Sequence, residues 1–151
     1  MAAEATRRVQ LTRVYHFSAA HCLGNPALSA ADNATLYGPC SRPHGHNYYL
    51  EVTVAGVPDP LTGFAVDLMA LDRAVSREVL EQVDHHTLED APALAGVITT
   101  GEGLARAFWR TLSRTLPAGE LQRVVVQETA KNRFEYRGEE ASWRTANRSR
   151  G

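Results

Sequence analysis

The sequence has only two cysteines in 151 residues, Cys22 and Cys40. Two are too few for a disulfide scaffold, so we expect a reducing, cytoplasmic compartment. No stretch approaches the roughly 18 consecutive apolar residues that a membrane-spanning helix requires. The N-terminus also lacks the apolar run of a signal peptide. The sequence therefore predicts a protein without a membrane partner.

An excess of one charge is also missing. Sixteen Lys and Arg residues oppose 17 Asp and Glu residues, for a net charge of -1. This balance argues against nucleic acid as a partner bound by a broad basic surface. The length and the 44% hydrophobic content fit one domain with its own core. We assign residues 1–137 to that domain and the polar residues 138–151 to a loosely held tail.

Alternating apolar residues predict the strands. We expect long strands over residues 9–21 and about 44–55, a short strand at 64–66, and strands over 123–129 and 133–137. Proline, serine, asparagine and glycine residues between the first two strands predict a long loop.

Two amphipathic helices are expected between the strands. Asp67 can cap the first, which ends near Asp84, and the second begins at Thr99 with Glu102 in a capping-box position and ends at Pro117. This order predicts an α+β fold, an antiparallel four-stranded sheet with two helices on one face. Its open sheet edges favour pairing with another subunit.

Three histidines stand where they can meet. His44 and His46 flank Gly45 on one strand, so their side chains share a face, and His21 ends the other long strand on its apolar face. If the strands are neighbours, three imidazoles converge, which is the zinc arrangement that leaves a fourth position open. The alternative is a set of exposed imidazoles without a metal.

Cys40 lies four residues before His44. A thiol near Arg42 and a metal has its thiolate favoured and can act as a base or nucleophile. Alternatively, Cys40 is inert, or it is a fourth ligand that closes a structural zinc site. Cys22 points to the opposite face from His21, and we assign it no chemistry.

Carboxylates provide two further candidates. Asp84 precedes His85, and such a pair can orient the imidazole for proton transfer, although histidines at a helix C-terminus also interact with its dipole. Glu128 lies on the inner face of a valine-rich strand. It either forms a structural salt bridge or grips a guanidine-like ligand edge with its two oxygens.

Taken together, these motifs resemble one enzyme family, that of 6-pyruvoyltetrahydropterin synthase and 6-carboxytetrahydropterin synthase. The resemblance spans roughly residues 9 to 138. It rests on Phe17-Ser-Ala-Ala-His21, Cys40-x-x-x-His44-Gly-His46-Asn47, Val83-Asp84-His85-His86, Thr99-Thr-Gly-Glu102 and Gln127-Glu128-Thr129.

The resemblance implies a tunnelling (T-) fold, in which three subunits close their sheets into a barrel and two trimers stack. The expected homo-oligomer is thus a trimer or hexamer with active sites at subunit boundaries. By this likeness the three histidines, His21, His44 and His46, hold Zn2+. The catalytic groups are then Cys40 as the base and Asp84 with His85 as its acid/base partner.

The implied substrate is a small-molecule pterin triphosphate, 7,8-dihydroneopterin triphosphate. Glu128 anchors the pterin in this interpretation, and Thr100 and Glu102 lie near the same pocket. The family contains two lyase branches. One releases triphosphate to form 6-pyruvoyltetrahydropterin, and the other also loses acetaldehyde to form 6-carboxy-5,6,7,8-tetrahydropterin on the queuosine route.

The short spacing from Cys40 to His46 and the triplet that begins at Asp84 resemble the carboxy-forming branch, which we favour. The longer loop before Cys40 resembles the pyruvoyl-forming branch, which is the alternative. A zinc hydrolase and a structural zinc protein without activity are further alternatives. Two features depart from the family: Cys22 replaces an arginine, and Gly101 and Gly103 replace hydroxyl and amide residues.

Overall fold

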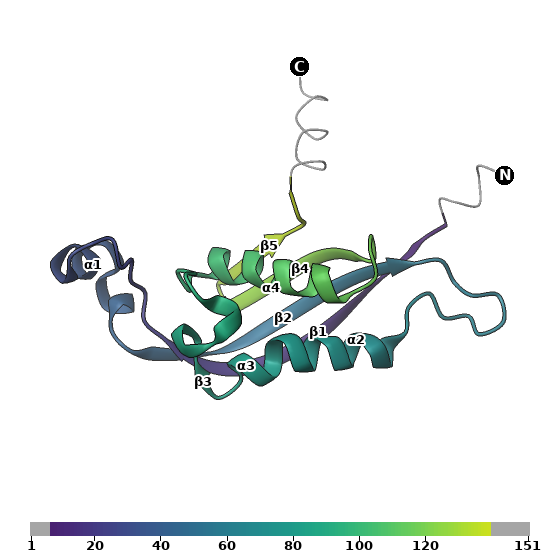
Figure 1. The fold of residues 1–151 in the computed structure, drawn as a ribbon, viewed down its shortest axis with the longest axis horizontal. Coiled ribbons are helices and arrows are strands. Elements are labelled where there is room, and N and C mark those ends of the chain that lie inside the picture. Colours follow the sequence, from purple (N-terminus) through teal and green to yellow (C-terminus); the bar gives the residue numbers. More distant parts are fainter. Residues whose placement is uncertain (1–6, 140–151) are drawn as a thin grey trace, which may run out of the picture.

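A computed structural model describes residues 7–139 of the chain. Of the expected polar tail, residues 138–151, all but Gly138 and Glu139 lie outside the described part. No helix among the described residues combines the length and apolar character needed to cross a lipid bilayer. The described chain forms one sheet with helices packed against it (Figure 1).

The sheet has five strands and mixed direction. Its strands are β1 (Val9–His21), β2 (His44–Gly56), β3 (His86–Thr87), β4 (Leu121–Thr129) and β5 (Asn132–Tyr136), in the spatial order β3-β1-β2-β4-β5. Four of them pair antiparallel, as expected, but β3 runs parallel to the end of β1. The expectation of a four-stranded, purely antiparallel sheet was therefore wrong. The missing strand is two residues long, too short to produce an alternating pattern.

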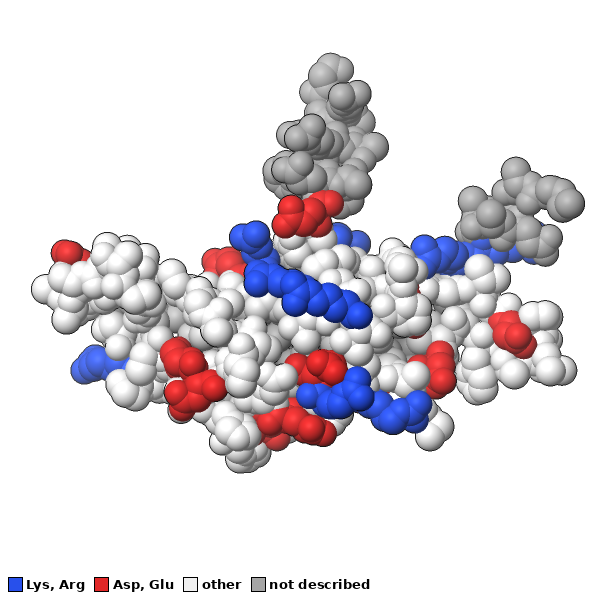
Figure 2. All heavy atoms as spheres, in the orientation of Figure 1, with Lys and Arg blue, Asp and Glu red and all other residues white. Residues whose placement is uncertain are grey.

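Two long helical segments cover one face of the sheet. The first contains α2 (Leu68–Val75), a π-helical turn (Ser76–Leu80) and α3 (Glu81–Val83) without a break, and the second is α4 (Gly101–Thr115). Their apolar sides pack on the inward face of the strands (Figure 1). This arrangement confirms the two expected helices on one face. On the side shown in Figure 2, basic and acidic side chains are interspersed over these elements.

The structure corrects three details between the strands. The expected loop before residue 44 contains α1 (Ala30–Tyr37) and the 3-10 turn η1 (Gly38–Ser41). Residues 64–66 form no strand. The N-cap of α4 is Thr100, whose hydroxyl accepts a hydrogen bond from the Gly103 N–H at 3.1 Å. Thr99 turns inward to other partners, so the expected capping box does not form.

The core lies between the inner face of the sheet and the two helical segments. Its largest members share full burial: Phe17, Tyr48, Leu50, Leu71, Leu104, Phe108 and Leu112. The alternation of β1 and β2 places Phe17, Tyr48 and Leu50 inward, and the same alternation continues to the histidines at the strand ends. The position of the histidines is therefore tied to the packing of the core.

Arg13 and Tyr15 of β1 and Asp72 of α2 form a cluster of hydrogen bonds, here called the polar latch. The Asp72 carboxylate accepts hydrogen bonds from Arg13 at 2.9 and 3.1 Å and from the Tyr15 hydroxyl at 2.7 Å. These donors stabilise the ionised carboxylate, first through Arg13 and then through Tyr15, and lower the pKa of Asp72.

This latch predicts a pH-dependent stability. Because the pKa of Asp72 is lowered in the folded state, its contribution is present above the unfolded pKa of about 3.9 and is lost as the pH falls through the folded value. Asp72→Asn should lower the free energy of unfolding at pH 7 by about 0.5–1 kcal/mol, the usual range for a partly exposed pair. In urea titrations the difference from the native chain should shrink toward pH 3. Asp90→Asn, an exposed carboxylate outside the latch, is the control, and a pH-independent difference for Asp72→Asn would contradict the assignment.

Candidate metal centre

The pairing of β1 with β2 brings three histidines together. His21 lies directly opposite His44 in the antiparallel register, and His46 lies opposite Ala19. One ligand nitrogen from each imidazole lies within 4.8 Å of the other two. The ring centroids are 4.4 to 5.2 Å apart. The expected convergence of these residues is thus present in the structure.

Backbone carbonyls orient two of the three rings. The Nδ1 of His21 is 3.0 Å from the Thr99 carbonyl oxygen, and the Nδ1 of His44 is 2.7 Å from that of Arg42. A carbonyl can only accept a hydrogen bond, so each Nδ1 carries the proton and each Nε2 keeps its lone pair. This tautomer and orientation are what a metal-ligating histidine requires.

Burial favours the neutral form of His21 and His46. Burial, reinforced by the neighbouring His44, lowers the pKa of His21. Burial also lowers the pKa of His46, against the opposing effect of Glu128. A neutral imidazole is the form that binds a metal. A donor set of three imidazole nitrogens fits a zinc ion with one open position.

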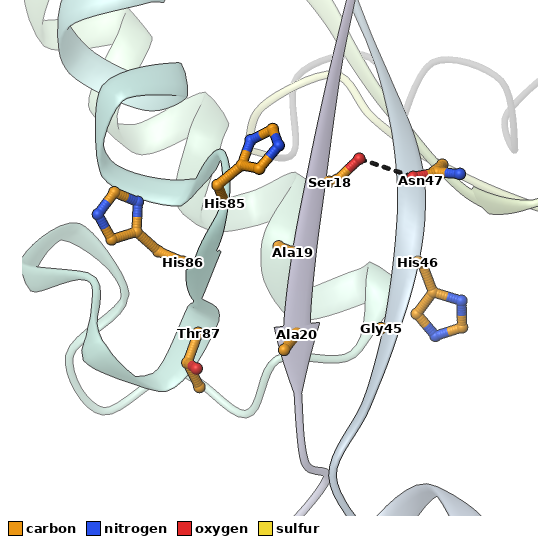
Figure 3. A pocket seen from close by; sticks show the side chains of 9 residues that line it. All are labelled: Ser18, Ala19, Ala20, Gly45, His46, Asn47, His85, His86 and Thr87. Carbon is orange, nitrogen blue, oxygen red and sulfur yellow. Dashed lines mark hydrogen bonds between the residues drawn. The ribbon is translucent and has the colours of Figure 1, made fainter.

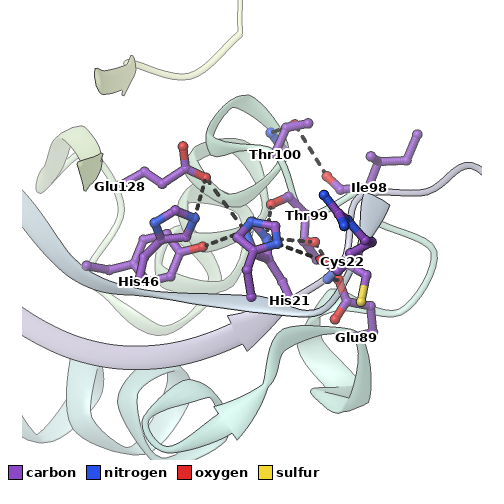
Figure 4. Close-up of polar contacts among 12 residues, drawn as sticks. His21, Cys22, His46, Glu89, Ile98, Thr99, Thr100 and Glu128 are labelled. Atoms are coloured by element: carbon purple, nitrogen blue, oxygen red, sulfur yellow. Dashed lines mark hydrogen bonds and ion pairs between the residues drawn. The ribbon is translucent and has the colours of Figure 1, made fainter. Parts of the chain in front are cut away.

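Glu128 and Tyr48 complete the surroundings of the histidines. The Oε1 of Glu128 is 3.8 Å from the Nε2 of both His21 and His46 (Figure 4). The Tyr48 hydroxyl is 3.4 Å from the Nε2 of His21, and its ring stacks on Phe17. Burial raises the pKa of Tyr48 well above its ordinary value, so the hydroxyl remains protonated. The sequence pattern does not single out Tyr48, because an inward tyrosine on an alternating strand is typical of a core.

Asp84 and His85 lie at the β3 edge of the sheet. The Oδ1 of Asp84 accepts the Ser18 N–H at 2.9 Å and lies 2.9 Å from the Nδ1 of His85. The Ser18 bond is the main reason why the pKa of Asp84 is lowered. The Nδ1 of His85 can donate to this carboxylate, which leaves its Nε2 free to exchange a proton. The expected acid/base pair is therefore in hydrogen-bonding contact.

His85 borders a hollow on the outer face of the sheet. The hollow has a volume of about 480 Å³ and is lined by Ser18, Asn47, His85 and Thr87, among others (Figure 3). Ser18 and Asn47 have the opposite parity to the metal-centre histidines on their strands, so their side chains point away from the core. The imidazole of His85 thus opens toward a surface that the helices within residues 7–139 leave uncovered.

Comparisons with known proteins decide the family. Residues 10–139 match the family model described as 6-pyruvoyl tetrahydropterin synthase. The 6-pyruvoyl tetrahydrobiopterin synthase of Poecilia reticulata is 41% identical over 138 residues, covering 89% of this chain and 94% of that protein. That of Homo sapiens is 39% identical over 135 residues, covering 87% and 93%. The chain belongs to the 6-pyruvoyl tetrahydropterin synthase family.

A solved structure of the same family agrees with the fold. The 6-pyruvoyl tetrahydropterin synthase of Caenorhabditis elegans matches with a TM-score of 0.81 at 35% sequence identity, covering 87% of this chain and 96% of that one. The family resemblance expected from the motifs is therefore confirmed. The closure of sheets into a barrel stays a prediction, because one chain is described.

Cys40, which the family resemblance makes the base, lies apart from these groups. It is exposed on η1, and its thiol is not part of the histidine cluster. Within residues 7–139 its thiol makes no hydrogen bond to Asp84 or His85, and its carbonyl accepts the Leu23 N–H at 2.8 Å. The geometry therefore favours an open three-histidine site over one that the thiol closes.

The remaining site candidates lie at the start of α4. The Thr100 hydroxyl is occupied by capping, whereas the exposed Glu102 side chain has no hydrogen-bond partner in the described part of the chain. The two departures from the family here have a packing reason. A Cβ at Gly101 would overlap the Phe134 ring, and one at Gly103 would overlap the Ile98 carbonyl. The substrate-binding roles of Thr100 and Glu102 stay predictions.

The histidine cluster predicts one zinc ion per chain. His46→Ala should weaken zinc binding by more than the roughly 10–100-fold that loss of an outer-shell partner costs, because it removes a ligand. Chelator competition on the metal-free protein measures this. His16→Ala, a histidine on the outer face beside Tyr49, is the matched control and should bind zinc normally. Cys40→Ser should also bind normally, and a large loss there would indicate a thiolate ligand instead.

Proposed function

We propose that this chain is a zinc-dependent lyase that converts 7,8-dihydroneopterin triphosphate to 6-pyruvoyltetrahydropterin. The observation that carries the proposal is the similarity, over nearly the whole chain, to proteins named for this activity. The same similarity supports the pyruvoyl-forming alternative better than the carboxy-forming branch favoured from the motifs. Members of the family are lyases on pterins, which agrees with the expected reaction class.

The site has the groups that this reaction needs. A zinc ion held by the three histidines supplies a Lewis acid for the oxygens of the substrate side chain. Glu128, beside His21 and His46, offers a carboxylate acceptor for the amino-pyrimidine edge of the pterin. Tyr48 and His21 are buried beside these groups. Exclusion of water strengthens the electrostatic interactions of the zinc ion and of Glu128 with the substrate.

The residues assigned to proton transfer account for the hydrogens that move in the reaction. The Cys40 thiolate removes a carbon-bound proton from the side chain, and His85, oriented by Asp84, exchanges a second proton. Two side-chain hydrogens end on the pterin ring, a third leaves with the triphosphate, and the terminal carbon becomes a methyl group. The ring thus accepts the reducing equivalents that the side chain loses, so no external reductant is required.

A homo-oligomer brings these groups together in this proposal. His85 opens onto an outer face that no helix of the described part of the chain covers, and the Cys40 thiol lies outside the hollow that His85 borders. This outer face also exposes the apolar side chains of Val14 and Tyr49, and β3 and β5 are open edges. Pairing of edges in a trimer or hexamer covers such surfaces and supplies Cys40 from a neighbouring subunit.

Product analysis tests the proposed function. The zinc-loaded protein with 7,8-dihydroneopterin triphosphate should release triphosphate and 6-pyruvoyltetrahydropterin, measured by mass spectrometry. Cys40→Ala should slow turnover by roughly 10²–10⁴-fold, the usual loss for a general base, while zinc content stays unchanged. Cys22→Ala is the matched control and should keep its activity.

Each other outcome selects a different function. Acetaldehyde together with 6-carboxytetrahydropterin identifies the carboxy-forming branch. Full activity of Cys40→Ala removes the thiol from the mechanism. Bound zinc without any turnover favours a structural site, and turnover of an ester or amide without turnover of the pterin indicates a hydrolase.

A further inference from the structure

Glu89 contacts two groups next to His21, one of the three histidines of the metal centre. It belongs to the 3-10 turn η3 (Leu88–Asp90), and its Oε1 accepts the Thr99 hydroxyl at 2.7 Å and the Cys22 N–H at 3.1 Å (Figure 4). The carboxylate is exposed, whereas Thr99 is 2% exposed. The exposed Glu89 carboxylate thus contacts the buried Thr99 beside His21.

Both partners of Glu89 determine where His21 lies. The Thr99 carbonyl holds the Nδ1 of His21, and Cys22 directly follows His21 in the chain. The pairing of β1 with β2 ends at His21, and Thr99 lies in an irregular segment before α4. Regular secondary structure therefore fixes neither group, and a single oxygen of Glu89 holds both.

His44 differs in this respect. The Nδ1 of His44 is held by the carbonyl of Arg42, only two residues earlier in the same segment. His21 is 1% exposed, and its partner carbonyl is 78 residues away in the sequence. His21 is thus the imidazole whose orientation depends on how a distant loop is anchored.

We propose that Glu89 is a positioning residue for His21: it fixes Thr99 and Cys22 so that the Nε2 of His21 points at the metal position. The inference extends the proposed zinc site, on which it rests. An outer-shell partner of this kind orients the ligand and maintains its tautomer without touching the metal. The competing explanation is that Glu89 only ties two surface loops together, which would change stability but not the metal centre.

Zinc affinity in a set of matched variants separates these explanations. Glu89→Ala should weaken zinc binding about 10–100-fold in chelator competition. Glu89→Gln should restore affinity close to that of the native chain, because an amide oxygen still accepts both hydrogen bonds. Thr99→Val removes the hydroxyl but keeps the carbonyl, and it should cause a loss similar to that of Glu89→Ala. Asp90→Ala, the next exposed carboxylate, is the control.

The double variant tests whether the two residues act as one unit. If Glu89 works through Thr99, Glu89→Ala combined with Thr99→Val should bind zinc nearly as well as either single variant, because the shared contact is lost only once. Additive losses of zinc affinity in the double variant would contradict the inference that Glu89 acts through Thr99. Native zinc affinity in Glu89→Ala would overturn the proposal. Urea unfolding with a chelator present shows whether each metal-free variant is folded.

Nitrogen-15 NMR of the histidines keeps this test independent of the proposed function. In the metal-free native chain His21 should be protonated at Nδ1, and in Glu89→Ala it should become a mixture of tautomers. If the native chain binds no zinc, the proposed function fails and this readout alone decides the inference. An unchanged His21 tautomer in Glu89→Ala would then refute it.

Discussion

The register between β1 and β2 determines most of what this chain can do. Each strand alternates its side chains between two faces, so the pairing of His21 with His44 brings His46 onto the same inward face. A shift of one residue in this pairing would turn one strand's histidines and core residues outward together. The fully buried Phe17 and Tyr48, stacked on each other across the pair, oppose such a shift. The same packing therefore stabilises the core and holds the metal centre.

The segment after α3 adds a second constraint along the edge of β1. The carboxylate of Asp84 accepts the Ser18 N–H, the His85 N–H donates to the Ser18 carbonyl at 2.6 Å, and β3 pairs with the next two residues of β1. Glu89 continues this series by accepting the Cys22 N–H. His85 has a positive φ of 61°, which fits the abrupt change from helix to strand. A single short segment thus fixes the acid/base pair at one end and borders the metal centre at the other.

The sequence predicted those parts that repeat with a regular period. The inward positions of His21, His44 and His46 follow from two-residue alternation, and the helices follow from their amphipathic pattern. The short elements were not predicted, because β3 has only two residues and α1 lies in a polar loop. The spacing of Ser29 and Asp32, where the Ser29 hydroxyl accepts the Asp32 N–H, was a capping signal for α1 that could have been used.

Site residues whose role depends on contacts distant in the sequence were not predicted for another reason. Tyr48 looks like any other core residue of its strand, and only the structure shows its hydroxyl beside an imidazole. Glu89 lies in a polar turn, and its partners are 10 and 67 residues away in the sequence. Contacts of this length depend on how the helices pack on the sheet, which no local pattern describes.

The chain divides the proposed chemistry between two faces of one sheet. On the inner face, burial favours the neutral form of His21 and His46, which suits a metal, and the outer edge holds an ionised carboxylate with an exposed imidazole, which suits proton exchange. Placed together, the Asp84 charge and a metal ion would attract, and the carboxylate would compete for the open coordination position. Separation by the sheet avoids this competition within a subunit. In the proposed homo-oligomer, assembly brings the proton-transferring groups of one chain to the substrate on another, at a distance set by the interface.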